Sequence, residues 1–87
     1  MDDGRPLREF PDNYSIKAVG RDTDDFASHA RSIVEAAIEE KDSVTHKTRA
    51  SKNGSYPVTV YFIARDQAEL DNVFTTVNAD ERVLWVL

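Results

Sequence analysis

The sequence predicts an α+β domain in which two helices cover one face of a four-stranded antiparallel sheet. In residues 55–64, Val58, Val60 and Phe62 alternate with Thr59, Tyr61 and Ile63. This period of two, in side chains that are mostly β-branched or aromatic, indicates a strand. Two other stretches, 26–38 and 68–77, repeat apolar residues at helical spacing. The order strand, helix, strand, strand, helix, strand is the split β-α-β arrangement of the ferredoxin-like plait, with the first and third strands in the middle.

The first strand is expected over 13–20, where alternation is clear and Gly20 marks its end. The first helix is expected over 22–42, because no proline or glycine interrupts this stretch. Asp22 or Thr23 is the expected N-cap, since a short polar side chain there accepts a hydrogen bond from a free backbone N–H.

The second strand, 44–50, alternates weakly and carries several basic residues, so we expect it at an edge of the sheet. The Lys-Asn-Gly sequence at 52–54 predicts a hairpin turn, because Asn and Gly tolerate positive φ. Residues 55–64 then form a central strand, with Pro57 near its start, where a missing N–H is tolerated.

Asp66 and Glu69 resemble a capping box at the start of the second helix. The last strand, 82–87, is almost entirely apolar, so both of its faces are expected to be at least partly covered. The strand side chains expected in the core are Tyr14, Ile16, Ala18, Val58, Val60, Phe62, Val83 and Trp85.

Length and composition limit the classes of function that the chain can have. The 87 residues allow one domain, which we place at 10–87 after a flexible tail at 1–9. The net charge of -5 disfavours nucleic acid as a partner, because phosphate backbones repel an acidic chain. The absence of cysteine excludes thiol chemistry, and no apolar run is long enough to cross a membrane. A cytoplasmic location is expected.

Several short patterns point to a family. They are Phe10-Pro11, Lys17 and Gly20 around the first strand, Ser51-Lys52 with Gly54 and Tyr56 in the hairpin, and the apolar ending 83–87. Together they resemble the YbeD-like family of small uncharacterised bacterial proteins. The resemblance implies a ferredoxin-like plait similar to the ACT regulatory domains of amino-acid enzymes. It implies no catalytic residues, because the family has no established reaction.

The positions of the histidine and aspartate residues favour structural roles for them. His29 and His46 lie on different elements, whereas a metal site needs three or four converging ligands. Asp22, Asp24 and Asp25 cluster where the positive end of a helix dipole stabilises acids. We therefore expect no catalytic residue, no metal and no cofactor, and we expect that the chain is not an enzyme.

The sheet face turned away from the helices is the first candidate site. Its expected apolar members are Val19, Tyr61, Ile63, Leu84 and Val86. One interpretation is an interaction surface for a protein partner or for weak self-association, since exposed apolar patches mark such surfaces. The other is a set of scattered apolar residues, or a face covered by the Phe10-Pro11 segment.

The second candidate site is the basic run Lys47, Arg49 and Lys52 at the hairpin. It is interpreted either as a contact for an anion or an acidic partner, or as charge that protects an edge strand from aggregation.

These observations lead to two functional hypotheses. The first is a small non-enzymatic regulatory or adaptor domain, ACT-like, which binds a protein partner or a small ligand through the open sheet face or the hairpin edge. The alternative is nucleic-acid binding through the sheet face, because RNA-recognition domains of this topology stack bases on sheet aromatics. Tyr61 stands at the corresponding place, although the sheet lacks the basic aromatic motif of those domains.

Overall fold

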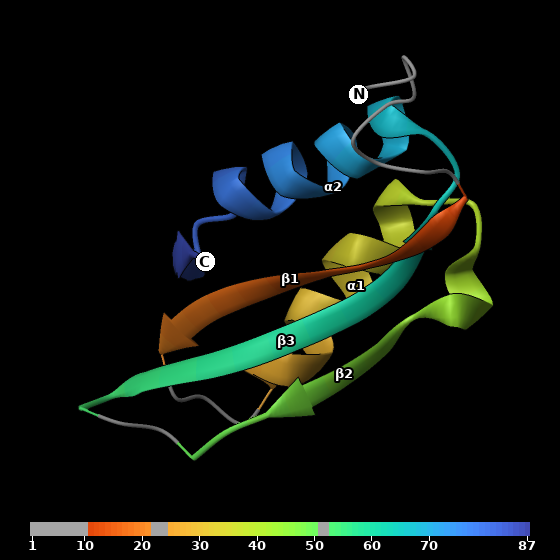
Figure 1. The fold of residues 1–87 in the computed structure, drawn as a ribbon. Helices are drawn as coiled ribbons and strands as arrows, with labels where there is room; N and C mark the ends of the chain where they lie inside the picture. The colour runs from red at the N-terminus through yellow and green to blue at the C-terminus, as the bar shows by residue number, and fades with distance from the viewer. Residues whose placement is uncertain (1–10, 22–24, 51–52) are drawn as a thin grey trace, which may run out of the picture.

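The computed structural model describes residues 11–21, 25–50 and 53–87. Within these residues the elements are β1 (Asp12–Arg21), α1 (Phe26–Ala37), the 3-10 turn η1 (Lys41–Ser43), β2 (Thr45–Thr48), β3 (Ser55–Ala64), α2 (Gln67–Ala79) and β4 (Val83–Val86). The strands form one antiparallel sheet in the order β2-β3-β1-β4. The predicted ferredoxin-like α+β plait is therefore confirmed. In Figure 1 the sheet stands in front and α1 crosses behind it.

The two central strands are the longest and form the frame of the sheet. β1 and β3 pair over ten residues each, from Asp12 opposite Ala64 to Arg21 opposite Ser55. Because directly opposed residues of antiparallel strands project to the same side, this register determines which side chains share a face. The edge strands β2 and β4 have four residues each.

The core lies between the sheet and the helices. Its buried members are Ile16, Ala18, Phe26, Ala30, Val34, Ile38, Val44, Val58, Val60, Phe62, Ala64, Leu70, Val73 and Val77. The alternation read from the first and third strands is thus confirmed. Tyr14 and Val83, also expected in the core, are partly buried against it.

Helix α1 is shorter than predicted at both ends. It starts after Asp25, whose side chain makes no capping hydrogen bond, while Asp22 and Thr23 lie outside the described residues. At the other end, Ile38 turns to extended geometry with φ -131° and still places its side chain in the core. The ammonium of Lys41 then donates to two carbonyls at this end, at 2.7 and 2.8 Å. These bonds satisfy acceptors that the helix leaves free.

Helix α2 begins at the predicted cap. The Asp66 carboxylate accepts the N–H of Glu69 at 2.8 Å. The side chain of Glu69 does not return to the cap residue, as a capping box requires. It accepts instead from the N–H of Arg65 at 2.9 Å and from that of Glu39 at 3.0 Å. Glu69 therefore ties the start of α2 to the segment that follows α1.

The hairpin between β2 and β3 has the predicted backbone. Asn53 and Gly54 have φ of 55° and 78°, the left-handed region in which Asn and Gly are favoured. Beyond the last residue of β2, the N–H of Arg49 donates to the carbonyl of Pro57 at 3.3 Å. The strand order confirms that β2 is an edge strand.

A β-bulge in β4 changes the expected alternation of the last strand. Val19 on β1 pairs with Trp85, and the next residue, Gly20, pairs with Val83. Leu84 is therefore the extra residue, without a partner in the β1–β4 pairing. An extra residue exchanges the two faces for everything on one side of it.

The bulge overturns two expectations. Trp85, expected in the core, lies opposite Val19 on the outward face and is 45% exposed. Val86, expected on the outward face, lies opposite Ala18 and packs against the core. Leu84 is 43% exposed beside Phe26, on the helix side of the sheet edge.

Phe26, the first residue of α1, connects several elements. A Cβ added to Gly20 would collide with the Phe26 ring, so this ring packs directly against the Gly20 backbone. Tyr56 of β3 meets the same ring edge-on, with ring centres 6.5 Å apart. The Arg82 guanidinium lies 5.9 Å from the Phe26 ring centre, which is within cation–π range.

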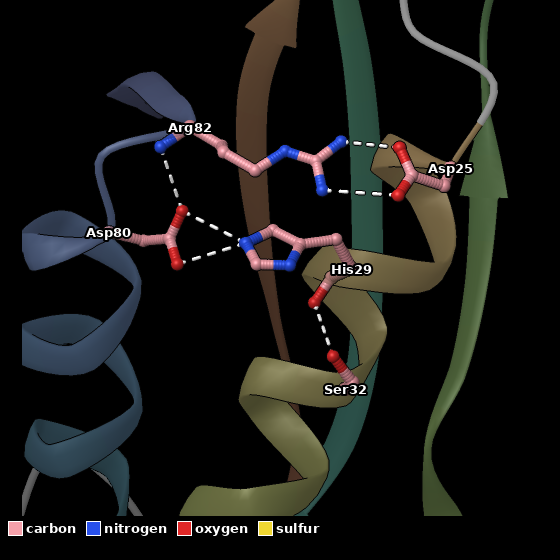
Figure 2. Close-up of polar contacts among 5 residues, drawn as sticks. All are labelled: Asp25, His29, Ser32, Asp80 and Arg82. Atoms are coloured by element: carbon pink, nitrogen blue, oxygen red, sulfur yellow. Dashed lines mark hydrogen bonds and ion pairs between the residues drawn. The ribbon is translucent and has the colours of Figure 1, made fainter.

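A polar cluster fixes the segment that leads into β4 (Figure 2). His29 Nε2 lies 3.0 and 2.9 Å from the two carboxylate oxygens of Asp80. The same carboxylate accepts the backbone N–H of Arg82 at 2.9 Å, and the Arg82 guanidinium donates to Asp25 at 2.6 and 3.3 Å. The start of α1 is thereby joined to the turn between α2 and β4.

The pKa of Asp80 reflects competing effects. Desolvation by burial is the largest single cause and would raise it. The hydrogen bonds from His29 and the Arg82 backbone, with the charges of both side chains, outweigh burial and lower the pKa below its ordinary value of 3.8. The hydrogen bond and charge of Asp25 raise the pKa of Arg82.

We expect Gly20→Ala to lower the free energy of unfolding by about 1–3 kcal/mol, because the new methyl group forces the Phe26 ring out of place. Phe26→Leu frees space at this contact, so the double variant should lose less than the sum of the single variants. Urea unfolding of the four proteins measures the coupling. Purely additive losses would contradict the steric explanation.

We expect Trp85→Ala to cost about 1–2 kcal/mol, because nearly half of this side chain is already in water. Phe62→Ala, which empties a fully buried core position, should cost ~3–5 kcal/mol. Circular dichroism during urea unfolding compares the two variants. Equal losses would return Trp85 to the core.

Acidification tests the polar cluster. Because folding lowers the pKa of Asp80, its contribution is present above 3.8 and is lost as the pH falls through the folded pKa. Asp80→Asn should therefore be less stable than the parent at about pH 6 and lose less stability on acidification to about pH 3. Glu81→Gln, one residue away and exposed, is the matched control and should follow the parent. Identical pH profiles for the parent and Asp80→Asn would contradict this role.

Candidate functional site

The outward face of the sheet, called the open face below, is built from rows of side chains that cross all four strands. The first row runs from Arg49 to Pro57, Val19 and Trp85. Val19 is paired with Pro57 on one side and with Trp85 on the other, and Arg49 bonds to Pro57. This row exists only because the bulge turns Trp85 outward.

The second row runs from Lys47 to Thr59, Lys17 and Leu87. Lys47 pairs with Thr59, and Thr59 pairs with Lys17. The N–H of Leu87 donates to the carbonyl of Lys17 at 2.9 Å, which continues the β1–β4 pairing by one residue. Two lysines thus flank the middle of the open face.

A shallow hollow of about 340 Å³, called the Trp85 hollow below, lies where these rows meet β4. Its lining residues are Lys17, Val19, Asn53, Ser55, Pro57, Trp85 and Leu87. Val19 is only 3% exposed although it stands outside the core cluster, so it forms the floor of the hollow. Trp85 and Leu87, which is 70% exposed, are accessible apolar side chains of its wall.

The remaining outward residues of β3 extend the face toward the other end of the sheet. Tyr61 is 38% exposed and lies between Ser15 and Thr45. Lys47 places its ammonium 5.9 Å from the centre of the Tyr61 ring. Ile63 is half-buried in the next row.

Charge is segregated between the two sides of the domain. The outward register positions of the described strands carry no Asp or Glu, and Asp12 takes an inward position opposite Ala64. The same face carries Lys17, Lys47 and Arg49. A positively charged face therefore stands on a chain whose net charge is -5.

The structure brings together only part of the predicted apolar patch. Val19, Tyr61 and Ile63 lie on the open face, whereas Leu84 stands at the bulge and Val86 faces the core. Trp85 was missed, because strict alternation assigned it to the core. Gly20 was the available signal, since a glycine within a strand pattern often marks a bulge.

The basic run is also only partly described. Lys47 and Arg49 occupy consecutive outward rows of the sheet and are exposed. Lys52 lies outside the described residues, as does Phe10 of the Phe10-Pro11 segment that was one expected cover of the open face.

The polar cluster brings Ser32, His29 and Asp80 near one another without forming a catalytic triad (Figure 2). The Ser32 hydroxyl donates to the backbone carbonyl of His29 at 2.8 Å, whereas a nucleophile would bond to the imidazole ring. His29 Nε2 contacts the Asp80 carboxylate and so joins α1 to the turn that follows α2. This arrangement supports a structural role for His29.

The second histidine, His46, lies on the edge strand opposite Val60, and its Nδ1 is buried without a hydrogen-bond partner among the described residues. Across residues 11–21, 25–50 and 53–87, no three His, Asp or Glu side chains gather in a way that would hold a metal ion. In the same ranges, none of the helices has the length and apolar character needed to cross a membrane.

Two solved structures share this fold. The solution structure of protein HP0495 from H. pylori aligns with a TM-score of 0.75, covering 99% of this chain and 91% of that chain. The solution structure of the C-terminal domain of the MgtC protein from Mycobacterium tuberculosis aligns with a TM-score of 0.65, covering 94% and 89%. Sequence identity is 13% in both cases, so the likeness concerns the fold alone.

Sequence relatives extend over nearly the whole chain. The UPF0250 protein NE1487 of Nitrosomonas europaea is 28% identical over 82 residues, covering 93% of this chain and 94% of the relative. A UPF0250 protein of Paraburkholderia phytofirmans is 30% identical over 82 residues, covering 93% and 92%. The family described as "Protein of unknown function (DUF493)" matches residues 5–87. The chain therefore belongs to the DUF493/UPF0250 family of small uncharacterised bacterial proteins, which confirms the resemblance to the YbeD-like family.

Proposed function

We propose that this chain is a non-enzymatic regulatory or adaptor domain that binds a partner through its open face. The observation that carries the proposal is the first cross-sheet row, in which Trp85 and Pro57 flank a buried Val19 and Arg49 stands at the end. An apolar centre with a polar, charged rim is the usual anatomy of a binding surface.

Lys47 and Arg49 of the basic run belong to the same surface. Lys47 and Arg49 lie in the rows that cross Thr59 and Pro57, so the two sites proposed from the sequence are continuous in space. The Trp85 hollow, at about 340 Å³, also has the size of a small-ligand site. The proposal therefore covers a protein partner and a small ligand.

Nucleic-acid binding is the second candidate, and the exposure of Trp85 favours it more than the sequence did. Trp85 is an exposed aromatic side chain on a face that carries lysines, and bases stack on such side chains. The net charge of -5 weighs against it. Binding of poly(U) at low salt that weakens steeply as salt is added would favour this candidate.

The test is affinity capture from a lysate of the native organism. We expect a partner to be retained by the parent and lost from two variants of the open face, Trp85→Ser and Lys47→Glu with Arg49→Glu. The charge variant should change stability by only about 0–1 kcal/mol, because these side chains are exposed. Circular dichroism confirms that each variant is folded.

Arg65→Glu is the matched control. It makes the same kind of charge reversal at an exposed residue whose ion pair is with Glu39, at 3.8 Å. The control should retain the partner. If all proteins, including the open-face variants, capture the same set, the open face is not the binding surface.

A further inference from the structure

We infer that the open face binds an extended acidic polypeptide segment that inserts an aliphatic side chain into the Trp85 hollow. This inference rests on the proposed function and specifies the chemistry of the partner. Its two parts are an apolar anchor and a basic rim.

The anchor is the hollow between β3, β1 and β4. Its floor, Val19, is already buried, whereas Trp85 is 45% exposed and Leu87 is 70% exposed. A branched aliphatic side chain placed against them would remove apolar surface from water on several sides at once. The hollow is open to solvent, so a side chain of an extended segment can enter it.

The rim determines the charge of the partner. Lys17 lines the hollow itself, and Arg49 stands in the same cross-sheet row as Trp85. Lys47 occupies the neighbouring row. The outward positions of the described strands carry no Asp or Glu, so the charged side chains that a carboxylate meets at these positions are basic.

The same features disfavour a nucleic acid and a second copy of the chain. The Lys47 ammonium lies over the Tyr61 ring, where a base would have to stack. In a two-fold dimer formed through this face, the basic face of one copy would lie against the basic face of the other. An acidic polypeptide meets neither obstacle.

The first experiment selects binders from a displayed library of random peptides on the full-length parent, with Lys17→Glu/Lys47→Glu as the counter-selection. We expect enriched peptides to share an aliphatic residue flanked by Asp or Glu. No enrichment, or enrichment of peptides without acidic residues, would overturn the inference.

The second experiment uses Trp85 as the probe, since it is the single tryptophan of the chain. A selected peptide should shift its emission in a saturable manner, and Lys17→Glu/Lys47→Glu should weaken binding at least tenfold. Replacing the aliphatic residue of the peptide by Ser should weaken binding similarly. Arg65→Glu, the charge-reversal control, should bind as the parent does.

Other occupants give different results. Saturable binding of poly(U) without binding of the peptides would assign the face to nucleic acid. Emission that shifts with protein concentration would assign it to a second copy. Emission that shifts on Phe10→Ser would assign it to the amino-terminal segment of the chain. Each outcome overturns the inference.

The two proposals fail separately. If the open-face variants lose their captured partner but acidic peptides do not bind, the open face is a binding surface of different chemistry. If peptides bind the parent and the charge-reversed variant equally, the basic rim plays no part and the inference falls.

Discussion

The packing of Phe26 against Gly20 is the contact on which the placement of the open face depends. With no side chain on Gly20, the start of α1 lies directly against β1, and the Phe26 ring also meets Tyr56 and Arg82. Gly20 is also the residue at which the β1–β4 pairing changes register. A larger residue at this one position would collide with the Phe26 ring.

The register change also determines which side chains β4 contributes to the open face. Without it, Trp85 would face the helices and the outward face of β4 would lack its aromatic residue. With it, β4 contributes Trp85 to the open face and Val86 to the core. The polar cluster around Asp80 holds the chain where it enters this strand, so the position of Trp85 depends on ion pairs as well as on packing.

The domain separates its charges by face. The acidic side chains among the described residues lie on helices, turns and strand ends, and Asp66, Glu69 and Asp80 among them cap a helix or join elements. The outward rows of the described sheet keep basic side chains. A fold of this kind does not by itself determine a function, which depends on the side chains that its surface carries.

The sequence by itself determined the order of the elements, the central place of β1 and β3 and most of the core. These follow from local patterns: alternation in Ser55–Ala64, the helical stripes and the cap at Asp66. Only the tertiary structure decided the face of each residue in β4. A bulge depends on pairing with another strand, and an entirely apolar segment has no alternation of apolar and polar residues that would reveal it. It also joined Arg49, Pro57, Val19 and Trp85 into one row, since residues so distant in sequence become neighbours only through the strand register.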